Sequence, residues 1–240
     1  MNSRHSMYTM LLLLTLPLRP LASSQNAGMN PSRGRFQILH SFQGGTDGLD
    51  PAAGLIADGA GNFYSTTSFG GGGCAGGGCG TVFKIDKAGN ETVLYVFTGG
   101  SDGKYPSASL VKDASGNLYG TAGGGSHNNG TVFKLDASGN FTVLYAFAGG
   151  ADGGGFISAL IRDLAGNLYG TTSTGGDLKC RSANVPGCGT VFKLGTDGRE
   201  TVLYTFVGGA HGANPQASVV PRRGWQFLWH NFLRRQPHLL

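Results

Sequence analysis

The chain has 240 residues, of which 44 are glycine, while charged residues make up 13% and aromatic residues 10%. Disordered segments usually carry more charge and fewer aromatics, so this composition indicates many short strands joined by glycine turns. The formal net charge is +5, but residues 25–220 hold 12 Lys and Arg against 13 Asp and Glu. The body of the chain therefore lacks the basic surface of a nucleic-acid-binding protein.

Residues 1–24 have the features of a secretory signal peptide. A positively charged start precedes a mainly apolar stretch, residues 7–18, and small residues precede a predicted cleavage site before Gln25. The stretch is shorter than the ~20 apolar residues of a membrane span, and no other segment reaches that length. We therefore expect an exported mature chain, secreted or at the cell surface and without a membrane span, that begins with a linker at 25–35. The alternative for the apolar stretch is a buried strand or helix.

Residues 36–220 contain one unit that repeats. In the second unit the strand candidates are TVLYVF, SLVKD, NLYGT and TVFKLD, which are rich in β-branched and aromatic residues. Two of the connections, at 113–117 and 136–140, have the form Asp-x-x-Gly-Asn, which suits a short hairpin turn because the Asp caps its own turn and the Gly can adopt a positive φ. The motif GTVFK occurs at 80–84, 130–134 and 189–193, VLY at 93–95, 143–145 and 202–204, and GNLYG at 116–120 and 166–170. We expect three full units, 36–92, 93–142 and 143–201, and a partial one, 202–220.

A four-stranded unit of about 50 residues is typical of a propeller blade. The sequence thus predicts an all-β, propeller-type array of four-stranded antiparallel units, incomplete at three and a half repeats. Residues 35–42 match the TVLYxF strand with no GTVFK strand before them, which fits a propeller whose two ends share a blade. Aromatic residues recur at fixed places and are expected to form the core between blades, an aromatic ligand-stacking row being the alternative. They are Phe83, Phe133, Phe192, Tyr64, Tyr119 and Tyr169.

The combined run GTVFKLDxxGNxTVLYxFxGGxDGxxPxAxLIxDxxGNLYGTTxxGG resembles the GloVer tandem repeat of bacterial exported and cell-surface proteins. The resemblance covers residues 36–220. It implies secretion, in some members with a separate C-terminal anchor (choice-of-anchor proteins), and a β-propeller fold. It implies no established activity and no known catalytic residues.

Residues 221–240 do not resemble the repeat. At an offset of 59 residues, however, Trp225 and Trp229 align with Gly166 and Gly170 of the third unit. The tryptophan codon TGG read one base later begins GG, which encodes glycine. We therefore hypothesise that residues 221–240 are out-of-frame translation, and that in the shifted frame the repeat continues. A basic amphipathic tail that binds an anionic surface is the alternative.

The four cysteines form two local pairs, each in the loop before a GTVF strand. The equivalent loop of the middle unit has no cysteine. At this site the two cysteines are either both present or both absent. In an exported chain this pattern predicts the disulfides Cys74–Cys79 and Cys180–Cys188. A zinc site is the alternative, but it would need the loops of the first and third units to meet. No metal site or cofactor is predicted.

Acidic residues recur in the GGxDG loops. Asp47, Asp102 and Asp152 occupy matching positions, where His211 stands in the fourth loop. They are ligand-binding candidates for a cation or a sugar on one rim, and the alternative is an aspartate that caps its own turn.

No nucleophile elbow, zinc-protease motif or P-loop occurs, so no catalytic residues are predicted. The sequence favours a non-catalytic binding or surface-interaction module for an extracellular glycan or surface component. The alternative is an extracellular polysaccharide hydrolase or lyase that uses acidic rim residues as acid and base.

Overall fold

The computed structural model describes residues 8–9, 37–182, 185–222 and 226–228. In these ranges the chain forms β-strands and one short 3-10 helix, η1 (Gly209–His211), and no α-helix. None of the helical structure described there is long and apolar enough to cross a membrane. The predicted signal peptide, apart from Tyr8–Thr9, and the predicted linker lie outside the described residues.

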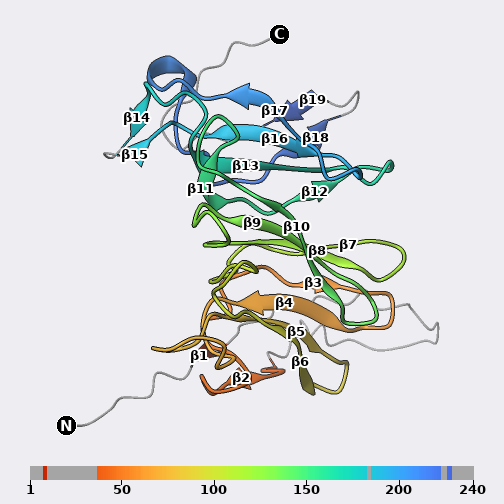
Figure 1. Ribbon diagram of the computed structural model, residues 1–240. Coiled ribbons are helices and arrows are strands. Elements are labelled where there is room, and N and C mark those ends of the chain that lie inside the picture. Colours follow the sequence, from red (N-terminus) through yellow and green to blue (C-terminus); the bar gives the residue numbers. More distant parts are fainter. Residues whose placement is uncertain (1–7, 10–36, 183–184, 223–225, 229–240) are drawn as a thin grey trace, which may run out of the picture.

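Three antiparallel sheets with one strand order make up the body of the structure (Figure 1). The first contains β3 (Ile56–Ala57), β4 (Phe63–Thr67), β5 (Thr81–Ile85) and β6 (Glu91–Val96). The second contains β7 (Val111–Lys112), β8 (Leu118–Ala122), β9 (Thr131–Leu135) and β10 (Phe141–Ala146). The third contains β12 (Ile161–Arg162), β13 (Leu168–Thr174), β16 (Thr190–Leu194) and β17 (Glu200–Thr205), and β11 (Gly154–Ile157) also pairs with β13.

The sheets divide the repeat at a different point from the sequence units. The TVLY strand β6 pairs with β5, the strand before it, rather than with β7. The units 93–142 and 143–201 begin at this strand, so each of them spans two sheets. The physical reason is loop length: a tight turn at residues 86–90 joins β5 to β6, whereas residues 97–110 separate β6 from β7.

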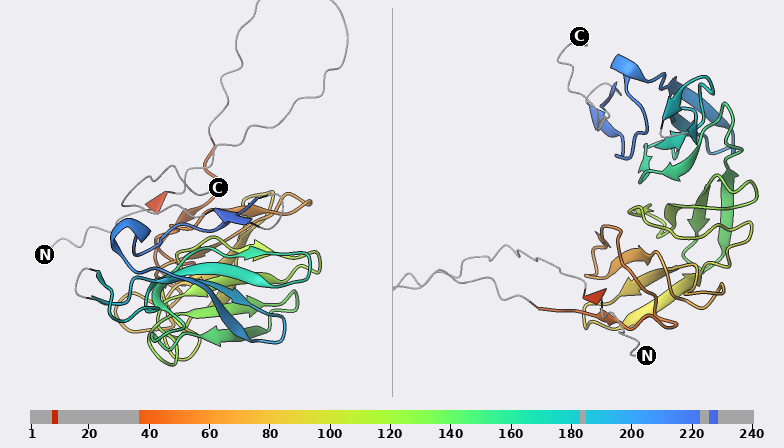
Figure 2. Two further views of the ribbon diagram at one scale, coloured as in Figure 1. Left: turned by 90° about the horizontal axis from the view of Figure 1, so that it is seen from above. Right: turned by 90° about the vertical axis from the view of Figure 1, so that its left-hand side faces the viewer.

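The sheets stand side by side around an open arc (Figure 2), which confirms the predicted propeller-type array. One edge-to-face phenylalanine pair lies between β2 and the first sheet, and one lies between each two neighbouring sheets. The ring centroids are 4.9 Å apart for Phe42–Phe83, 5.4 Å for Phe97–Phe133 and 5.0 Å for Phe147–Phe192. All six side chains are fully buried, so the repeated Phe83, Phe133 and Phe192 form the predicted core.

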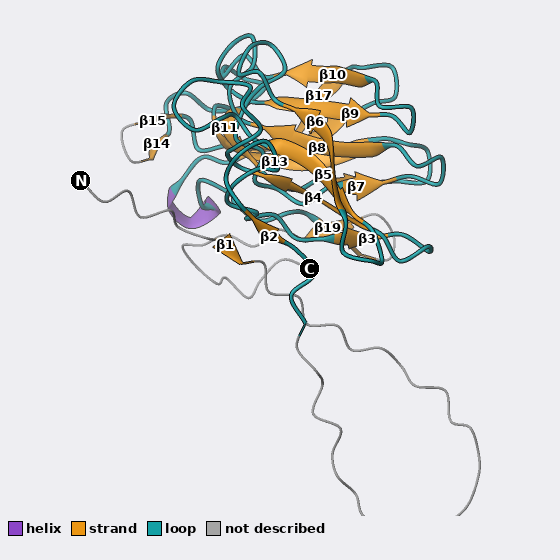
Figure 3. Ribbon diagram, turned by 90° about the horizontal axis from the view of Figure 1, so that it is seen from below, coloured by secondary structure: helices purple, strands orange, loops and turns teal. Residues whose placement is uncertain are grey.

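Loops of two kinds gather at opposite ends of the strands (Figure 3). The short Asp-x-x-Gly-Asn turns lie at one end. The long loops that contain the cysteines lie at the other, and one of them includes the small hairpin β14 (Arg181–Ser182) and β15 (Val185–Pro186).

Two two-stranded sheets flank these three sheets. At one side β2 (Ser41–Phe42) pairs with β1 (Tyr8–Thr9). At the other side β18 (Val220–Arg222) pairs with β19 (Gln226–Leu228), with Val220 opposite Leu228. In the third sheet Ile161 lies opposite Tyr169, and these two residues precede Val220 and Leu228 by the same 59 positions. The two pairs therefore have the same register. The two tryptophans and residues 230–240 lie outside the described residues, and the out-of-frame origin of 221–240 stays a prediction.

Candidate functional site

A short segment precedes each of the strands β3, β7, β12 and β18, one segment in each of the four repeat units. Its first residue has a positive φ in all four units: 60° at Asp50, 54° at Tyr105, 80° at Gly155 and 52° at Asn214. A bulky residue such as tyrosine rarely adopts this conformation. The Tyr105 N–H donates to the carbonyl of Cys79 at 2.8 Å, and the Asn214 N–H donates to the carbonyl of Cys188 at 2.9 Å. The cysteine loops therefore hold this turn in the unit that follows them.

The four segments line one cavity. Its volume is about 460 Å³, and each unit contributes the residues that follow the positive-φ turn. We call it the axial cavity. It is lined by Ala52, Gly54, Ser107, Ala108, Ser109, Phe156, Ile157, Ser158, Ala159, Gln216, Ala217 and Ser218.

Buried threonines fasten each segment to the preceding sheet. The hydroxyls of Thr66, Thr121 and Thr171, at equivalent places in β4, β8 and β13, are at most 3% exposed. They donate at 3.2 Å to the carbonyls of Pro106, Ile157 and Ala217 respectively. The Ser109 hydroxyl also accepts the Gly54 N–H at 3.1 Å. These bonds cross from one unit to the next, so the walls of the axial cavity are pre-formed.

The predicted ligand-binding residues Asp102 and Asp152 lie in loops away from the axial cavity lining. One carboxylate oxygen of Asp102 accepts from the Tyr95 hydroxyl at 3.0 Å and the Thr98 N–H at 2.7 Å, and the other accepts from the Thr98 hydroxyl at 2.7 Å. Asp152 accepts in the same way from the Tyr145 hydroxyl at 3.1 Å and the Ala148 N–H at 2.7 Å. Asp102 is only 7% exposed. These contacts are those of the alternative, an aspartate that caps its own turn; ligand binding by these carboxylates stays a prediction.

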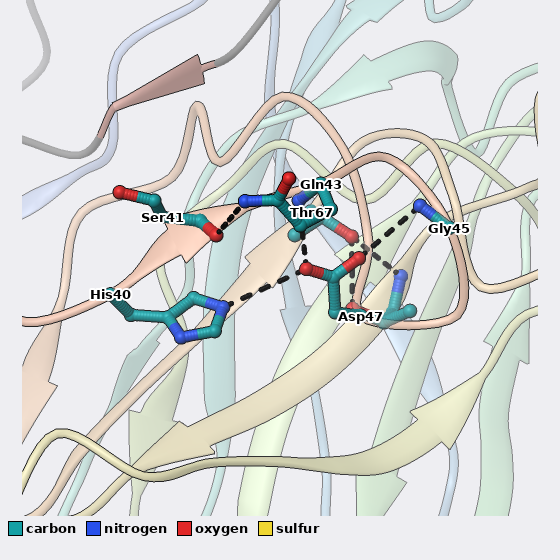
Figure 4. Close-up of polar contacts among 7 residues, drawn as sticks. His40, Ser41, Gln43, Gly45, Asp47 and Thr67 are labelled. Carbon is teal, nitrogen blue, oxygen red and sulfur yellow. Dashed lines mark hydrogen bonds and ion pairs between the residues drawn. The ribbon is translucent and has the colours of Figure 1, made fainter.

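In the first unit histidine replaces the tyrosine of this arrangement (Figure 4). Asp47 accepts the N–H of Gln43 at 2.8 Å and the N–H of Gly45 at 3.2 Å, and the His40 Nε2 lies 3.7 Å from its carboxylate. The Tyr and Asp of this arrangement are seven residues apart. The equivalent residues are His40 and Asp47 in the first unit, and Tyr204 of β17 and His211 in the fourth unit. The structure places each of the three predicted aspartates in its own loop and brings none of them to the axial cavity.

Two glutamates were missed by the sequence analysis. Burial, together with the nearby Asp47, raises the pKa of Glu91 to about 7, and burial together with Asp152 does the same for Glu200. The Oε1 atom of each is buried without a hydrogen-bond partner among the described residues. The middle unit has Phe141 at this position, and its ring stacks on Tyr95 of the first sheet with centroids 3.9 Å apart. Only one feature of the sequence could have pointed to these glutamates, namely that one repeat position holds Glu, Phe and Glu in the three full units.

The motifs and the fold agree with one protein family. A family model described as the Gloeobacter/Verrucomicrobia repeat matches residues 26–228. The chain belongs to this repeat family. The match confirms, at the level of the family, the resemblance that the GTVFK and GNLYG motifs indicated. No curated protein matches the chain in sequence.

Several solved structures are similar to this Gloeobacter/Verrucomicrobia repeat chain. One is virginiamycin B lyase from Staphylococcus aureus, at 10% identity and a TM-score of 0.43, with 71% of this chain and 45% of that chain covered. A luciferin-regenerating enzyme has 16% identity, a TM-score of 0.43 and coverage of 69% and 48%. A putative gluconolactonase has 16% identity, a TM-score of 0.40 and coverage of 70% and 50%. The chain spans about half the length of these three structures.

Both predicted disulfides of the repeat protein are present. Cys74 is bonded to Cys79, with Cα atoms 5.4 Å apart, and Cys180 to Cys188, with Cα atoms 5.7 Å apart. The zinc alternative for these cysteines is thereby wrong. Among the described residues no group of three or more His, Cys, Asp or Glu side chains could hold a metal ion.

Proposed function

We propose that this protein is an exported, non-catalytic binding module whose ligand site is the axial cavity. The observation that carries the proposal is that all four units place the same repeat segment around one cavity of about 460 Å³. This volume lies within the ~300–1,000 Å³ typical of small-molecule sites. The predicted signal peptide and the two disulfides support export, because disulfides persist in oxidising compartments.

The lining of the axial cavity favours binding over catalysis. A polysaccharide hydrolase or lyase needs an acid and a base within reach of the scissile bond. The lining residues include no Asp, Glu, His, Lys or Arg. The carboxylates of Asp102 and Asp152 accept hydrogen bonds from their own loops, and the raised-pKa glutamates each have a buried oxygen. These contacts support a binding role.

The proposal is tested by filling the axial cavity. Ala52 is exposed and lines it, so Ala52→Trp would fill it with little disturbance of the core. Ala165→Trp, at an exposed position in the turn after Asp163, is the matched control. We expect a panel of neutral and charged small molecules to include ligands that raise the melting temperature of the wild type and of Ala165→Trp, but not of Ala52→Trp.

Two results would contradict the proposal. Ligands that stabilise Ala52→Trp as well as the wild type would place binding elsewhere. Release of reducing ends from a polysaccharide by the wild type, lost in Ala52→Trp, would establish the hydrolase or lyase alternative instead.

A further inference from the structure

We infer that the axial cavity binds a neutral saccharide, with the Phe156 ring stacked against one face of a sugar. This inference rests on the proposed function in taking the axial cavity as the ligand site. It adds the chemical class of the ligand and the residue that carries recognition.

The absence of charge in the axial cavity lining selects a neutral ligand. A carboxylate, phosphate or ammonium group that entered would find no lining side chain of opposite charge. Acidic polysaccharides and cationic ligands are therefore disfavoured.

The polar groups of the lining match sugar hydroxyls. Ser107, Ser218 and Gln216 make no side-chain hydrogen bond within the described part of the chain, and they line the axial cavity from two different units. A serine hydroxyl both donates and accepts, and a carboxamide offers a separate donor and acceptor. Sugar hydroxyls also donate and accept, so several such groups on one ligand could be satisfied together.

By contrast, Ser158 already has its partners. Its hydroxyl donates to the Ala159 carbonyl at 3.2 Å and accepts the Thr171 N–H at 3.0 Å. Ser158 is 6% exposed and holds the wall of the axial cavity in place.

Phe156 supplies an apolar face beside these polar groups. It lines the axial cavity and yet is 76% exposed, at the position where the other three units have Pro51, Pro106 and Pro215. Its N–H donates to the Ser173 hydroxyl at 2.9 Å, a bond that proline could not make. Because Phe156 both lines the axial cavity and is exposed, its ring is available to a ligand there.

Phe156 and a sugar are complementary in shape and charge. The face of an aromatic ring is apolar and carries partial negative charge. One face of a pyranose ring presents C–H groups, which are apolar and slightly positive, while its rim presents hydroxyls. A sugar that stacks on Phe156 therefore directs hydroxyls toward the serines and Gln216.

The inference is tested by calorimetric titration of the full chain with defined oligosaccharides. The neutral probes are cellohexaose, xylohexaose and mannohexaose, and the acidic probe is a galacturonic acid hexamer. We expect at least one neutral probe to bind, and Phe156→Ala to weaken its binding about tenfold through loss of the stacked face. Phe156→Tyr should retain binding within about twofold, because the aromatic face is kept.

Leu164→Ala is the matched control. Leu164 is 98% exposed, lies in the turn at residues 163–167 and does not line the axial cavity. Its removal should leave binding unchanged, which separates the role of Phe156 from a general loss of exposed apolar surface.

Three outcomes would overturn the inference, and they separate it from the proposed function. Tighter binding of the galacturonic acid hexamer than of any neutral probe, abolished by Ala52→Trp, would refute the neutral class and retain the axial cavity as the site. Binding of neutral probes unaffected by both Phe156→Ala and Ala52→Trp would refute both proposals. No binding of any probe at about 1 mM would refute the saccharide alone, because the thermal-shift panel tests the cavity independently.

Discussion

The loop before the GTVF strand is built in two ways, and the middle unit differs from its neighbours. Cys79, Asn129 and Cys188 occupy the same position, directly before the Gly-Thr of the strand. In the flanking units a disulfide closes the loop. In the middle unit the Asn129 side chain donates to the carbonyls of His127 and Ala148, each at 2.9 Å.

The disulfide and the asparagine fill the same space. A Cβ added to Gly99 would lie 2.7 Å from the Cys74 Sγ, and one added to the equivalent Gly149 would lie 2.5 Å from the Asn129 Nδ2. The Cys74 Sγ also lies 3.3 Å from the carbonyl of Thr98, which is equivalent to Ala148. In each of these units a side-chain group therefore fills this corner, and a disulfide is one of two solutions.

The largest effect is expected from removing a disulfide. Cys180→Ser combined with Cys188→Ser should lower the free energy of unfolding by about 2 kcal/mol, because the eight-residue loop gains freedom in the unfolded chain. It should also weaken ligand binding, since the Cys188 carbonyl holds Asn214 beside the axial cavity. Urea unfolding and the titration described above measure the two effects. Unchanged stability would mean that the rest of the loop suffices, as in the middle unit.

A smaller effect is expected from removing the Asn129 side chain, which takes the place of the disulfide in the middle unit. Asn129→Ala removes two hydrogen bonds from a partly exposed loop and should cost about 1 kcal/mol in urea unfolding. His127→Ala is the control, because its side chain is exposed and only its carbonyl is used. Equal losses in the two variants would show that Asn129 is not the counterpart of the disulfide.

The smallest effect on stability is expected from Glu91 and Glu200, the two glutamates with a raised pKa. The middle unit differs here too, because it has Phe141 at this position. The pKa of Glu200 is raised to about 7 from 4.5, so between these pH values the folded chain holds a proton that the unfolded chain has released. The free energy of unfolding should therefore fall as pH rises from about 4.5 to about 7. Because the carboxyl is partly exposed and screened, we expect less than about 1 kcal/mol.

Glu200→Gln should remove this part of the pH dependence, measured by urea unfolding at both ends of the window. Glu200 is the better test of the two glutamates, because Asp47 beside Glu91 also contacts the His40 ring at 3.7 Å. A pH profile of Glu200→Gln identical to that of the wild type would show that this carboxyl titrates normally.

Local patterns in the sequence predicted most of the fold. The Asp-x-x-Gly-Asn turns form as expected: the Asp58 carboxylate accepts from the N–H groups of Ala60 and Asn62, both at 2.9 Å, and from the Asn62 side chain at 2.8 Å. These hydrogen bonds lower the pKa of Asp58 below its usual value. Asp113 and Asp163 repeat the turn and, like Asp58, accept a tyrosine hydroxyl at 3.0 Å. Such contacts span at most six residues, so they can be read from the chain.

The candidate site was only partly foreseen. The motif PxA was visible in the repeat, but the sequence analysis gave it no role and placed ligand binding at Asp47, Asp102 and Asp152 instead. The segments at 52–54 and 107–109 are 55 residues apart in the chain, and their meeting depends on the curvature of the array. Phe156 was likewise indistinguishable from a core aromatic, because exposure is not encoded in the residue type.

The sequence by itself determined the period, the strands, the hairpin turns and the pairing of the cysteines, because each depends on residues close together in the chain. Only the tertiary structure decided which sheet the TVLY strand joins, how the glutamates come to lie beside Asp47 and Asp152, and that four repeat segments line the axial cavity. Those features depend on how neighbouring sheets pack through Phe83, Phe133 and Phe192. The angle between the sheets is the sum of many small contacts, none of which a repeat motif records.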